Sequence, residues 1–178
     1  MARIEPLPPG DVPDDVRAAL KGWLRADATD VPAPLDTLVR HPELARSFLG
    51  FNRHLLFEST LPPRTRELLI LRTAAICGSS FERVQHEVIG RREGIDDATI
   101  ARTLEGPGAP GWTDEDAVLV HATDELLTNW TISDAIWDEL AVALDDRQLM
   151  DLVFTVGSYA MLAMAFNAFG VVPGEPPL

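Results

Sequence analysis

The sequence is poor in cysteine and in basic residues. Cys77 is the single cysteine among 178 residues, so no intrachain disulfide can form, and one cysteine with four scattered histidines cannot build a structural zinc cluster. Lys and Arg number 15 against 28 Asp and Glu, which gives a net charge of −13. This acidity argues against nucleic acid and against an anionic membrane surface as partners.

The N-terminus lacks the apolar segment of a signal peptide, since it reads Met1-Ala-Arg-Ile-Glu-Pro. We therefore expect a cytoplasmic protein, and nothing in the composition calls for a metal or another cofactor. Sustained alternation of polar and β-branched residues is also missing, which argues against strands. With 46% hydrophobic and 24% charged residues, the chain is predicted to form one all-α domain. Residues 1–13, rich in proline, are expected to be an irregular arm.

Apolar residues at helical spacing, with caps and breakers, predict the helices. They are expected at residues 14–24, 42–58, 63–77, 79–93, 96–104 and 113–129, with two more starting near Ser133 and Asp145, and a loop at 27–34. The stretch from Leu152 to Val172 carries no charge and is long enough to span a membrane. A polar start and the absence of a second span favour a buried core helix or a subunit interface instead.

The most informative segment is a predicted helical hairpin over residues 64–95. Its first helix is apolar after a charged start that includes Glu67, and Gly78 ends it. In the second helix, Glu82 and His86 are four residues apart and so share one face. The spacing alone does not decide whether Glu67 reaches His86, because the two lie at unequal distances from the turn.

The same segment carries a family resemblance. The patterns R-x-R-E-L-x-I-L-R-x-A, G-x-x-F-E-x-x-x-H and R-x-x-G-I resemble the core of the carboxymuconolactone decarboxylase and AhpD-like family. Flanking segments agree, and the resemblance covers roughly residues 35–172. It implies an AhpD-like helical bundle with a central helical hairpin, assembled as a trimer or hexamer.

The peroxidase branch of the family uses a Glu, a CxxC pair and a His as a proton relay. By this resemblance the Glu falls on Glu67 and the His on His86, while Ser79 and Glu82 occupy the two cysteine positions. Cys77 lies two residues before the first of them and is not a displaced copy. A dithiol cycle needs two thiols, so peroxide reduction by the usual route is not expected.

Glu67, Glu82 and His86 remain as candidate catalytic residues. A histidine flanked by a carboxylate can give and take protons, which suits decarboxylation, isomerisation or lactone opening on a small carboxylated or lactone substrate. Glu82 favours the imidazolium while the helix N-terminus disfavours it, so we expect titration near neutrality. Candidate substrate-binding residues are Phe51, His54, Phe81, Ser79, Cys77 and Tyr159.

Structural interpretations stand beside each of these. Ser79 and Glu82 also fit a capping box, in which Glu82 reaches back to the Ser79 amide. His86 could be a histidine satisfied within the core, and Glu67 could complement the helix N-terminus or pair with a neighbouring arginine. Two other functions therefore remain open: a non-catalytic ligand-binding or scaffold protein on the same fold, and a thiol peroxidase that uses Cys77 alone.

Overall fold

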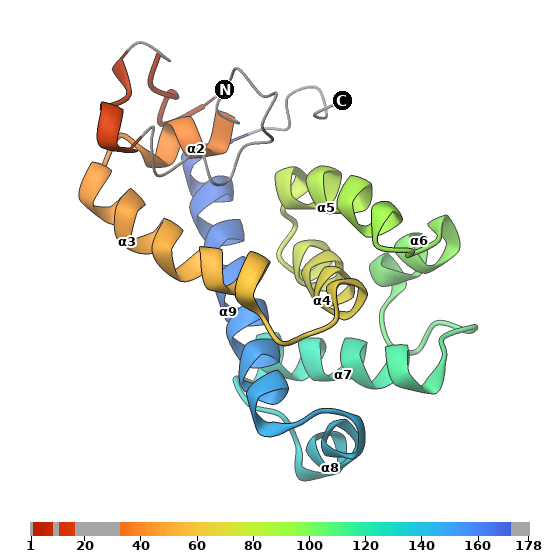
Figure 1. Cartoon of the computed structure of the whole chain (residues 1–178). Helices are drawn as coiled ribbons and strands as arrows, with labels where there is room; N and C mark the ends of the chain where they lie inside the picture. The colour runs from red at the N-terminus through yellow and green to blue at the C-terminus, as the bar shows by residue number, and fades with distance from the viewer. Residues whose placement is uncertain (1, 9–10, 17–32, 172–178) are drawn as a thin grey trace.

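The computed structural model describes residues 2–8, 11–16 and 33–171, and this part of the chain contains helices and no strand. The all-α prediction is thus confirmed there (Figure 1). The helices are α2 (Ala33–Leu38), α3 (Pro42–Arg53), the π-helix η2 (His54–Glu58), α4 (Pro63–Ile76), α5 (Ser80–Arg92), α6 (Asp97–Glu105), α7 (Asp114–Asn129), α8 (Asp134–Ala143) and α9 (Asp146–Phe169).

Most predicted helix starts are confirmed by their caps. The side chains of Asp96, Thr113 and Asp145 each accept a hydrogen bond from a backbone N–H in the first turn of α6, α7 and α9. Such caps satisfy donors that the helix itself leaves free, and for this reason these residue types mark helix starts in a sequence.

The N-terminal third differs from the prediction. Helix α2 begins at Ala33, inside the expected loop 27–34, because Leu35 and Leu38 gain burial against Val39 and Leu49. The remainder of that loop lies outside the described residues. The expected helix 14–24 is helical at residues 14–16, and its remainder also lies outside the described part.

The helix expected to continue to Glu58 changes from α to π at His54. The carboxylate of Asp151 on α9 accepts hydrogen bonds from His54 Nε2 at 3.0 Å and from the backbone N–H of Thr60 at 2.6 Å. Asp151 therefore ties both ends of this widened turn to α9, which gives a tertiary reason for a local change that no sequence pattern announced.

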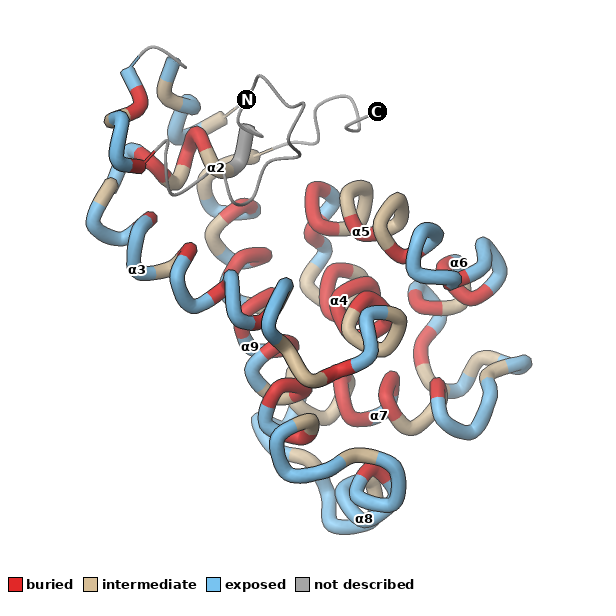
Figure 2. The backbone as a smooth tube through the Cα atoms, in the orientation of Figure 1, coloured by how far each residue is buried: buried red, intermediate tan, exposed pale blue. Residues whose placement is uncertain are grey.

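Helix α4 lies at the centre of the molecule. It packs against α5, α6, α7 and α9, and it is buried along most of its length (Figures 1 and 2). Leu68, Leu69, Ile70 and Leu71 are all fully buried. Four consecutive buried residues cover every side of the helix, which explains why its sequence is apolar all round instead of amphipathic.

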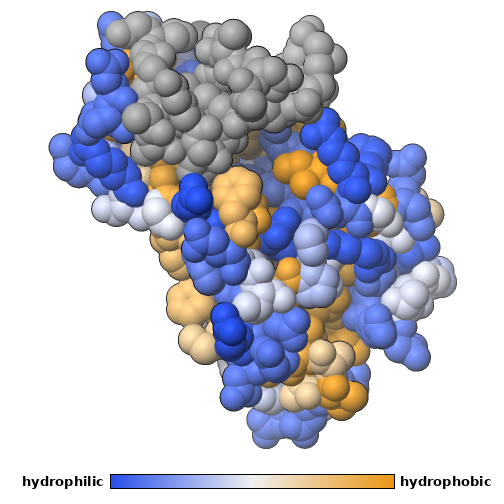
Figure 3. Space-filling view, viewed as in Figure 1, coloured by the Kyte–Doolittle hydropathy of each residue, from blue (hydrophilic) through white to orange (hydrophobic). Residues whose placement is uncertain are grey.

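Helix α9 is long and apolar enough to cross a membrane by length and composition, and in the described part of the chain it is alone in this. Leu152, Val156 and Ala163 on its inner side are at most 1% exposed, so it serves as a core helix of the bundle. Its outer side carries Met150, Phe154, Met161 and Met164, which are 45–61% exposed. Elsewhere, the face in Figure 3 is largely hydrophilic with separate apolar patches.

Candidate acid–base site

The turn between α4 and α5 folds the two helices against each other. Gly78 takes a positive φ of 61°, a conformation that glycine adopts without a Cβ penalty. The Ser79 N–H donates to the carbonyl of Ala74 at 3.0 Å, and the Ser79 side chain accepts from the Glu82 N–H at 3.5 Å. This turn sends α5 back along α4, so that residues eight or more positions from the turn on each helix can meet.

His86 lies between two carboxylates in this hairpin. Its Nδ1 is 2.6 Å from Oε2 of Glu67 on α4, and its Nε2 is 3.3 Å from Oε2 of Glu82 on α5. All three residues are buried, with exposures of 5% for His86, 0% for Glu67 and 4% for Glu82. The contact between Glu67 and His86, which the spacing left open, is therefore made, and it is the shorter of the two.

The expectation that His86 titrates near neutrality is wrong. Burial disfavours the imidazolium, but the charges and hydrogen bonds of Glu67 and then Glu82 outweigh it and raise the pKa of His86 from 6.5 to about 9. The sequence argument weighed Glu82 against the helix N-terminus and omitted the second carboxylate. With this pKa, His86 is an imidazolium between the side chains of Glu67 and Glu82 at neutral pH.

The capping box predicted at the start of α5 forms only in part. Ser79 caps the Glu82 N–H, but the Ser79 amide donates to Ala74, and the carboxylate of Glu82 contacts His86. The second half of a capping box would need Glu82 to turn back to that amide. Because the amide is already satisfied, Glu82 is free to pair with the imidazole.

One aromatic residue from the predicted set contacts the histidine, and a second lies in the same buried cluster. The Tyr159 ring packs edge-on against His86 with centroids 5.0 Å apart, and Tyr159 belongs to the same buried cluster as Phe81. Burial, followed by the charges of Glu82 and Glu67, raises the pKa of the Tyr159 phenol well above 10. The phenol therefore stays protonated and can donate a hydrogen bond but not act as a base near neutrality.

The structure does not bring the other three predicted residues into contact with this cluster. The Cys77 carbonyl accepts a hydrogen bond from Asn167, and burial raises the pKa of the Cys77 thiol. His54 pairs with Asp151, and Phe51 packs against Phe154 with ring centroids 6.0 Å apart. Their proposed role in binding substrate remains a prediction, with no contact to His86 in its support.

Arg66 is the neighbouring arginine that pairs with Glu67, one of the structural interpretations the sequence left open, although the sequence analysis did not count it among the site residues. Its Nε donates to Oε1 of Glu67 at 3.3 Å, so it holds the carboxylate oxygen that His86 does not use. The available signal was its position, because it stands beside Glu67 in the first turn of a helix whose remainder is buried. A charge at such a place needs a partner inside the protein.

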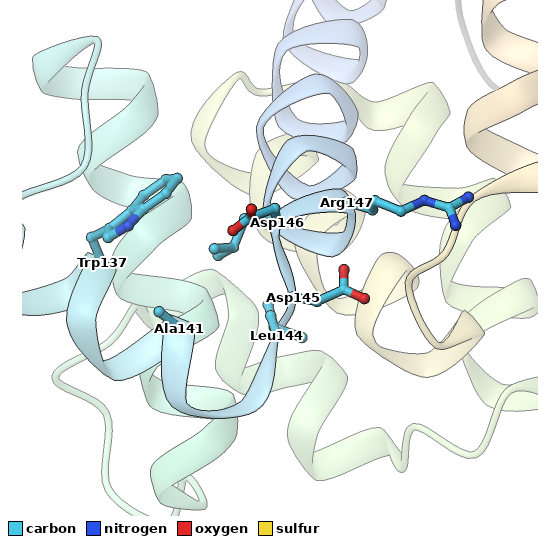
Figure 4. Close-up of a pocket in the computed structure, with 7 residues that line it drawn as sticks. Trp137, Ala141, Leu144, Asp145, Asp146 and Arg147 are labelled. Atoms are coloured by element: carbon cyan, nitrogen blue, oxygen red, sulfur yellow. The ribbon is translucent and has the colours of Figure 1, made fainter.

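The two described cavities lie away from His86. One, of about 510 Å³, is lined by Trp137 and Ala141 of α8 and by residues 144–147 and 149, where α9 begins (Figure 4). The other, of about 490 Å³, lies between the N-terminal turns of α4 and α7 and the end of α8. None of the nine predicted site residues lines either cavity. Within the described residues, no group of three or more His, Cys, Asp or Glu could hold a metal ion.

Solved structures of other proteins share this fold. A peroxidase-related protein from Ralstonia eutropha JMP134, described as an alkylhydroperoxidase AhpD core, matches with a TM-score of 0.83 and 18% identity over 98% of this chain and 93% of its own. The debrominase Bmp8, in a cysteine-to-alanine variant bound to 2,3,4-tribromopyrrole, matches with a TM-score of 0.78 and 14% identity. The match covers 97% of this chain and 91% of the debrominase chain. A peroxidase-related protein from Silicibacter sp. TM1040 matches with a TM-score of 0.77 and 19% identity, over 93% of this chain and 87% of its own. These likenesses define the class of fold, which is AhpD-like.

The family follows from the sequence. Residues 42–125 match the carboxymuconolactone decarboxylase family, so this segment, which holds the α4–α5 hairpin and all three acid–base residues, belongs to that family. The resemblance predicted from the motifs is confirmed. No curated protein matches the chain at a significant level.

Proposed function

We propose that this chain is a small acid–base enzyme that acts on a small carboxylated or lactone substrate, by decarboxylation, isomerisation or lactone opening. The observation that carries the proposal is the placement of His86 between Glu67 and Glu82. Proton donors and acceptors in hydrogen-bond contact, shielded from water, are the arrangement that general acid–base catalysis uses.

The two carboxylates have different roles in this proposal. The 2.6 Å contact makes Glu67 the positioning residue, which orients the imidazole and stabilises its cation. The 3.3 Å contact leaves Nε2 the more readily exchanged nitrogen, so Glu82 is its proton partner. Nε2 also faces the residue at one of the two family cysteine positions, which supports the reacting group being bound on this side.

A decarboxylation shows how the protons would move. The bond between the substrate carbon and its carboxylate breaks, carbon dioxide leaves, and the electron pair stays on the substrate as an enolate. Nε2 of the His86 imidazolium then donates its proton to the enolate carbon. Glu82 takes up a proton from solvent and passes it to Nε2, so the net reaction converts the carboxylate and one solvent proton into the protonated product and carbon dioxide, without an oxidant or reductant.

The size of substrate is supported by a relative of the same fold. The debrominase was crystallised with 2,3,4-tribromopyrrole, a single small ring. A lactone acid of similar size fits the proposal. We also propose a cytoplasmic location for the protein, which the presence of a single cysteine supports.

A second candidate, a non-catalytic binding or scaffold protein, is favoured by one observation. His86 and Glu82 are only 5% and 4% exposed, and neither lines a described cavity, so the cluster could act purely as a buried structural pair. A thiol peroxidase using Cys77 has less support, because burial raises the pKa of that thiol and so reduces its nucleophilic thiolate form.

The experiment is a panel of small lactones and β-keto or vinylogous acids, followed by carbon dioxide release and ultraviolet absorbance. The wild type should turn over at least one compound, and His86→Gln should lose about 10²–10⁴-fold in rate. Glu82→Gln should lose less and shift the pH optimum. Equal turnover by wild type and His86→Gln would make His86 structural, and a panel without any turnover would favour the scaffold.

A further inference from the structure

Arg66 and His86 share one carboxylate. Oε2 of Glu67 pairs with His86 Nδ1 at 2.6 Å, while Oε1 accepts a hydrogen bond from Arg66 Nε at 3.3 Å. A carboxylate held between two cations is fixed in position from both sides. The Arg66 guanidinium is thus an immediate neighbour of the acid–base cluster.

Arg66 differs from the comparably buried arginines in how it uses its donors. The side chains of Arg66, Arg72 and Arg83 are 12%, 10% and 14% exposed. Arg72 donates from its Nη groups to Asp124 and to the Thr103 carbonyl, and Arg83 donates from both Nη groups to acceptors on α6. The two Nη groups of Arg66 donate to no acceptor within residues 2–8, 11–16 and 33–171.

The two Nη groups of Arg66 are therefore available to bind an anion. A guanidinium carries five N–H donors in a planar fork, and Arg66 spends one of them on Glu67. The Arg66 side chain keeps 12% of its surface exposed, and its Nη groups are not among the buried polar atoms that lack a partner, so solvent can reach them. An anion that replaces this solvent would gain a charge-assisted, bidentate contact. The contact described for its side chain is with Glu67, a component of the site.

The charge balance of the site permits an anionic ligand. The cations of Arg66 and His86 offset the carboxylates of Glu67 and Glu82, so a further monoanion meets no net negative charge. Arg66 also acts on the ring that packs against His86: burial, Glu82 and Glu67 raise the pKa of the Tyr159 phenol, and the Arg66 charge opposes them.

We propose that Arg66 binds the carboxylate of the substrate through its two Nη groups and holds the reacting carbon toward His86 and Glu82. Two parallel N–H donors match the two oxygens of a carboxylate, which a lysine ammonium cannot do in the same geometry. The proposal rests on the proposed function and narrows its substrates to those with a carboxylate that the reaction retains, so that in a decarboxylation the departing group is a second carboxylate. Arg66 is here a substrate-binding residue, distinct from the proton-transferring pair.

The test is a binding measurement that does not depend on turnover. Titration calorimetry compares γ-carboxy-γ-butyrolactone with its uncharged methyl ester on wild type, Arg66→Gln, Arg66→Lys and the control Arg92→Gln. Arg92 lies exposed in the last turn of α5, so its replacement removes the same charge away from the site. Melting temperatures establish that each variant is folded.

Wild type and Arg92→Gln should bind the acid about 10- to 100-fold more tightly than the ester, the range of a charge-assisted pair. In Arg66→Gln the two compounds should bind alike, and Arg66→Lys should keep part of the preference. Arg66→Gln that binds the acid as wild type does would overturn the proposal, and so would a wild type that binds neither compound or favours the ester.

A parallel titration of His86→Gln separates this proposal from the proposed function. If His86→Gln keeps the preference for the acid but the wild type turns nothing over, Arg66 is an anion-binding residue in a protein without catalysis. If wild type turns over lactone esters and acids equally and Arg66→Gln changes neither rate nor binding, the catalytic proposal stands and Arg66 has no part in it.

Discussion

His86 combines deep burial with a retained positive charge. Burial alone would lower the pKa of an imidazole, and the charges and hydrogen bonds of Glu67 and Glu82 together raise it to about 9. An imidazolium that persists through the physiological range is suited to donating a proton, and it then depends on Glu82 to be protonated again. This favours reactions whose demanding step is protonation of a carbanion or enolate.

The raised pKa makes a prediction about stability. Because the pKa of His86 is higher in the folded state than the ordinary value of 6.5, its protonation stabilises the fold fully below about pH 6.5, and this contribution is lost as the pH rises through about 9. Melting temperatures measured from about pH 6 to pH 10 should fall for wild type toward the upper end. The part of this fall that comes from His86 should be missing in His86→Gln. If the melting temperatures of wild type and His86→Gln fall in parallel with pH, the raised pKa of His86 is contradicted.

Cys77 gives a second prediction for a single residue. Its side chain is partly buried, and in the described part of the chain there is no other cysteine with which it could form a disulfide. Cys77→Ser should therefore leave any turnover within about threefold of wild type. Hydroperoxide consumption that is present in wild type and abolished in Cys77→Ser would restore the peroxidase interpretation.

Among the elements, the α4–α5 hairpin was the most predictable from sequence. Gly78 and Ser79 predict the turn of the hairpin, and the apolar sequence of α4 predicts that this helix lies at the centre of the molecule. The sequence could not establish that Glu67 reaches His86, because that contact depends on the crossing of two helices and not on spacing within one. The family resemblance suggested that Glu67 and His86 act together, and the structure shows that they are 2.6 Å apart.

Other features were hidden from the sequence for the same reason. The π-turn at His54 and its tie to Asp151 join residues 97 positions apart. That the Nη groups of Arg66 donate to no acceptor in the described part of the chain can be seen only from the packed structure. Local signals such as caps and glycines predict where helices begin and end, whereas the pairing of charges between helices requires their packing.

The junction after α6 offers a prediction at the scale of an element. Gly106 has a φ of 97°, and a Cβ there would lie 2.8 Å from Nη2 of Arg72, which is hydrogen-bonded to Asp124 and Thr103. Gly106→Ala should cost about 3 kcal/mol or more, from backbone strain plus displacement of a buried ion pair. Gly94→Ala is the matched control, since Gly94 has a φ of 87° with nothing within 4 Å. It should cost about 1 kcal/mol.

Urea denaturation of the two variants measures this difference. Equal losses of free energy of unfolding in Gly106→Ala and Gly94→Ala would show that the Arg72 side chain moves aside without cost. A larger loss for Gly106→Ala would support the Arg72–Asp124 pair as a rigid link between α4 and α7.

At the scale of the whole molecule, the outer side of α9 stands out. Met150, Phe154, Met161 and Met164 form an exposed apolar stripe at helical spacing, and Phe51 extends it through its ring contact with Phe154. In a chain with a net charge of −13, a face without charge is where two copies can approach with least repulsion. We propose that the protein is a homo-oligomer that uses this face.

Light scattering at micromolar concentration tests the assembly. Wild type should exceed the mass of one chain, and Phe154→Asp or Met161→Lys should shift it toward monomer because each buries a charge in the interface. Arg92→Glu, a charge change at an exposed position in the last turn of α5, serves as a control and should leave the mass unchanged. A wild-type monomer would contradict the proposal.

The state of His86 tests the central claim most directly, because it can be measured without knowing the substrate. Nuclear magnetic resonance titration of histidine-labelled protein, with His86→Gln to assign the signal, should give a pKa of about 9 for His86. In Glu67→Gln it should fall by more than one unit, because the closest carboxylate is lost. A wild-type value at or below the ordinary 6.5 would mean that the imidazole is neutral at physiological pH, and the account of His86 as a charged proton donor held by two carboxylates would be wrong.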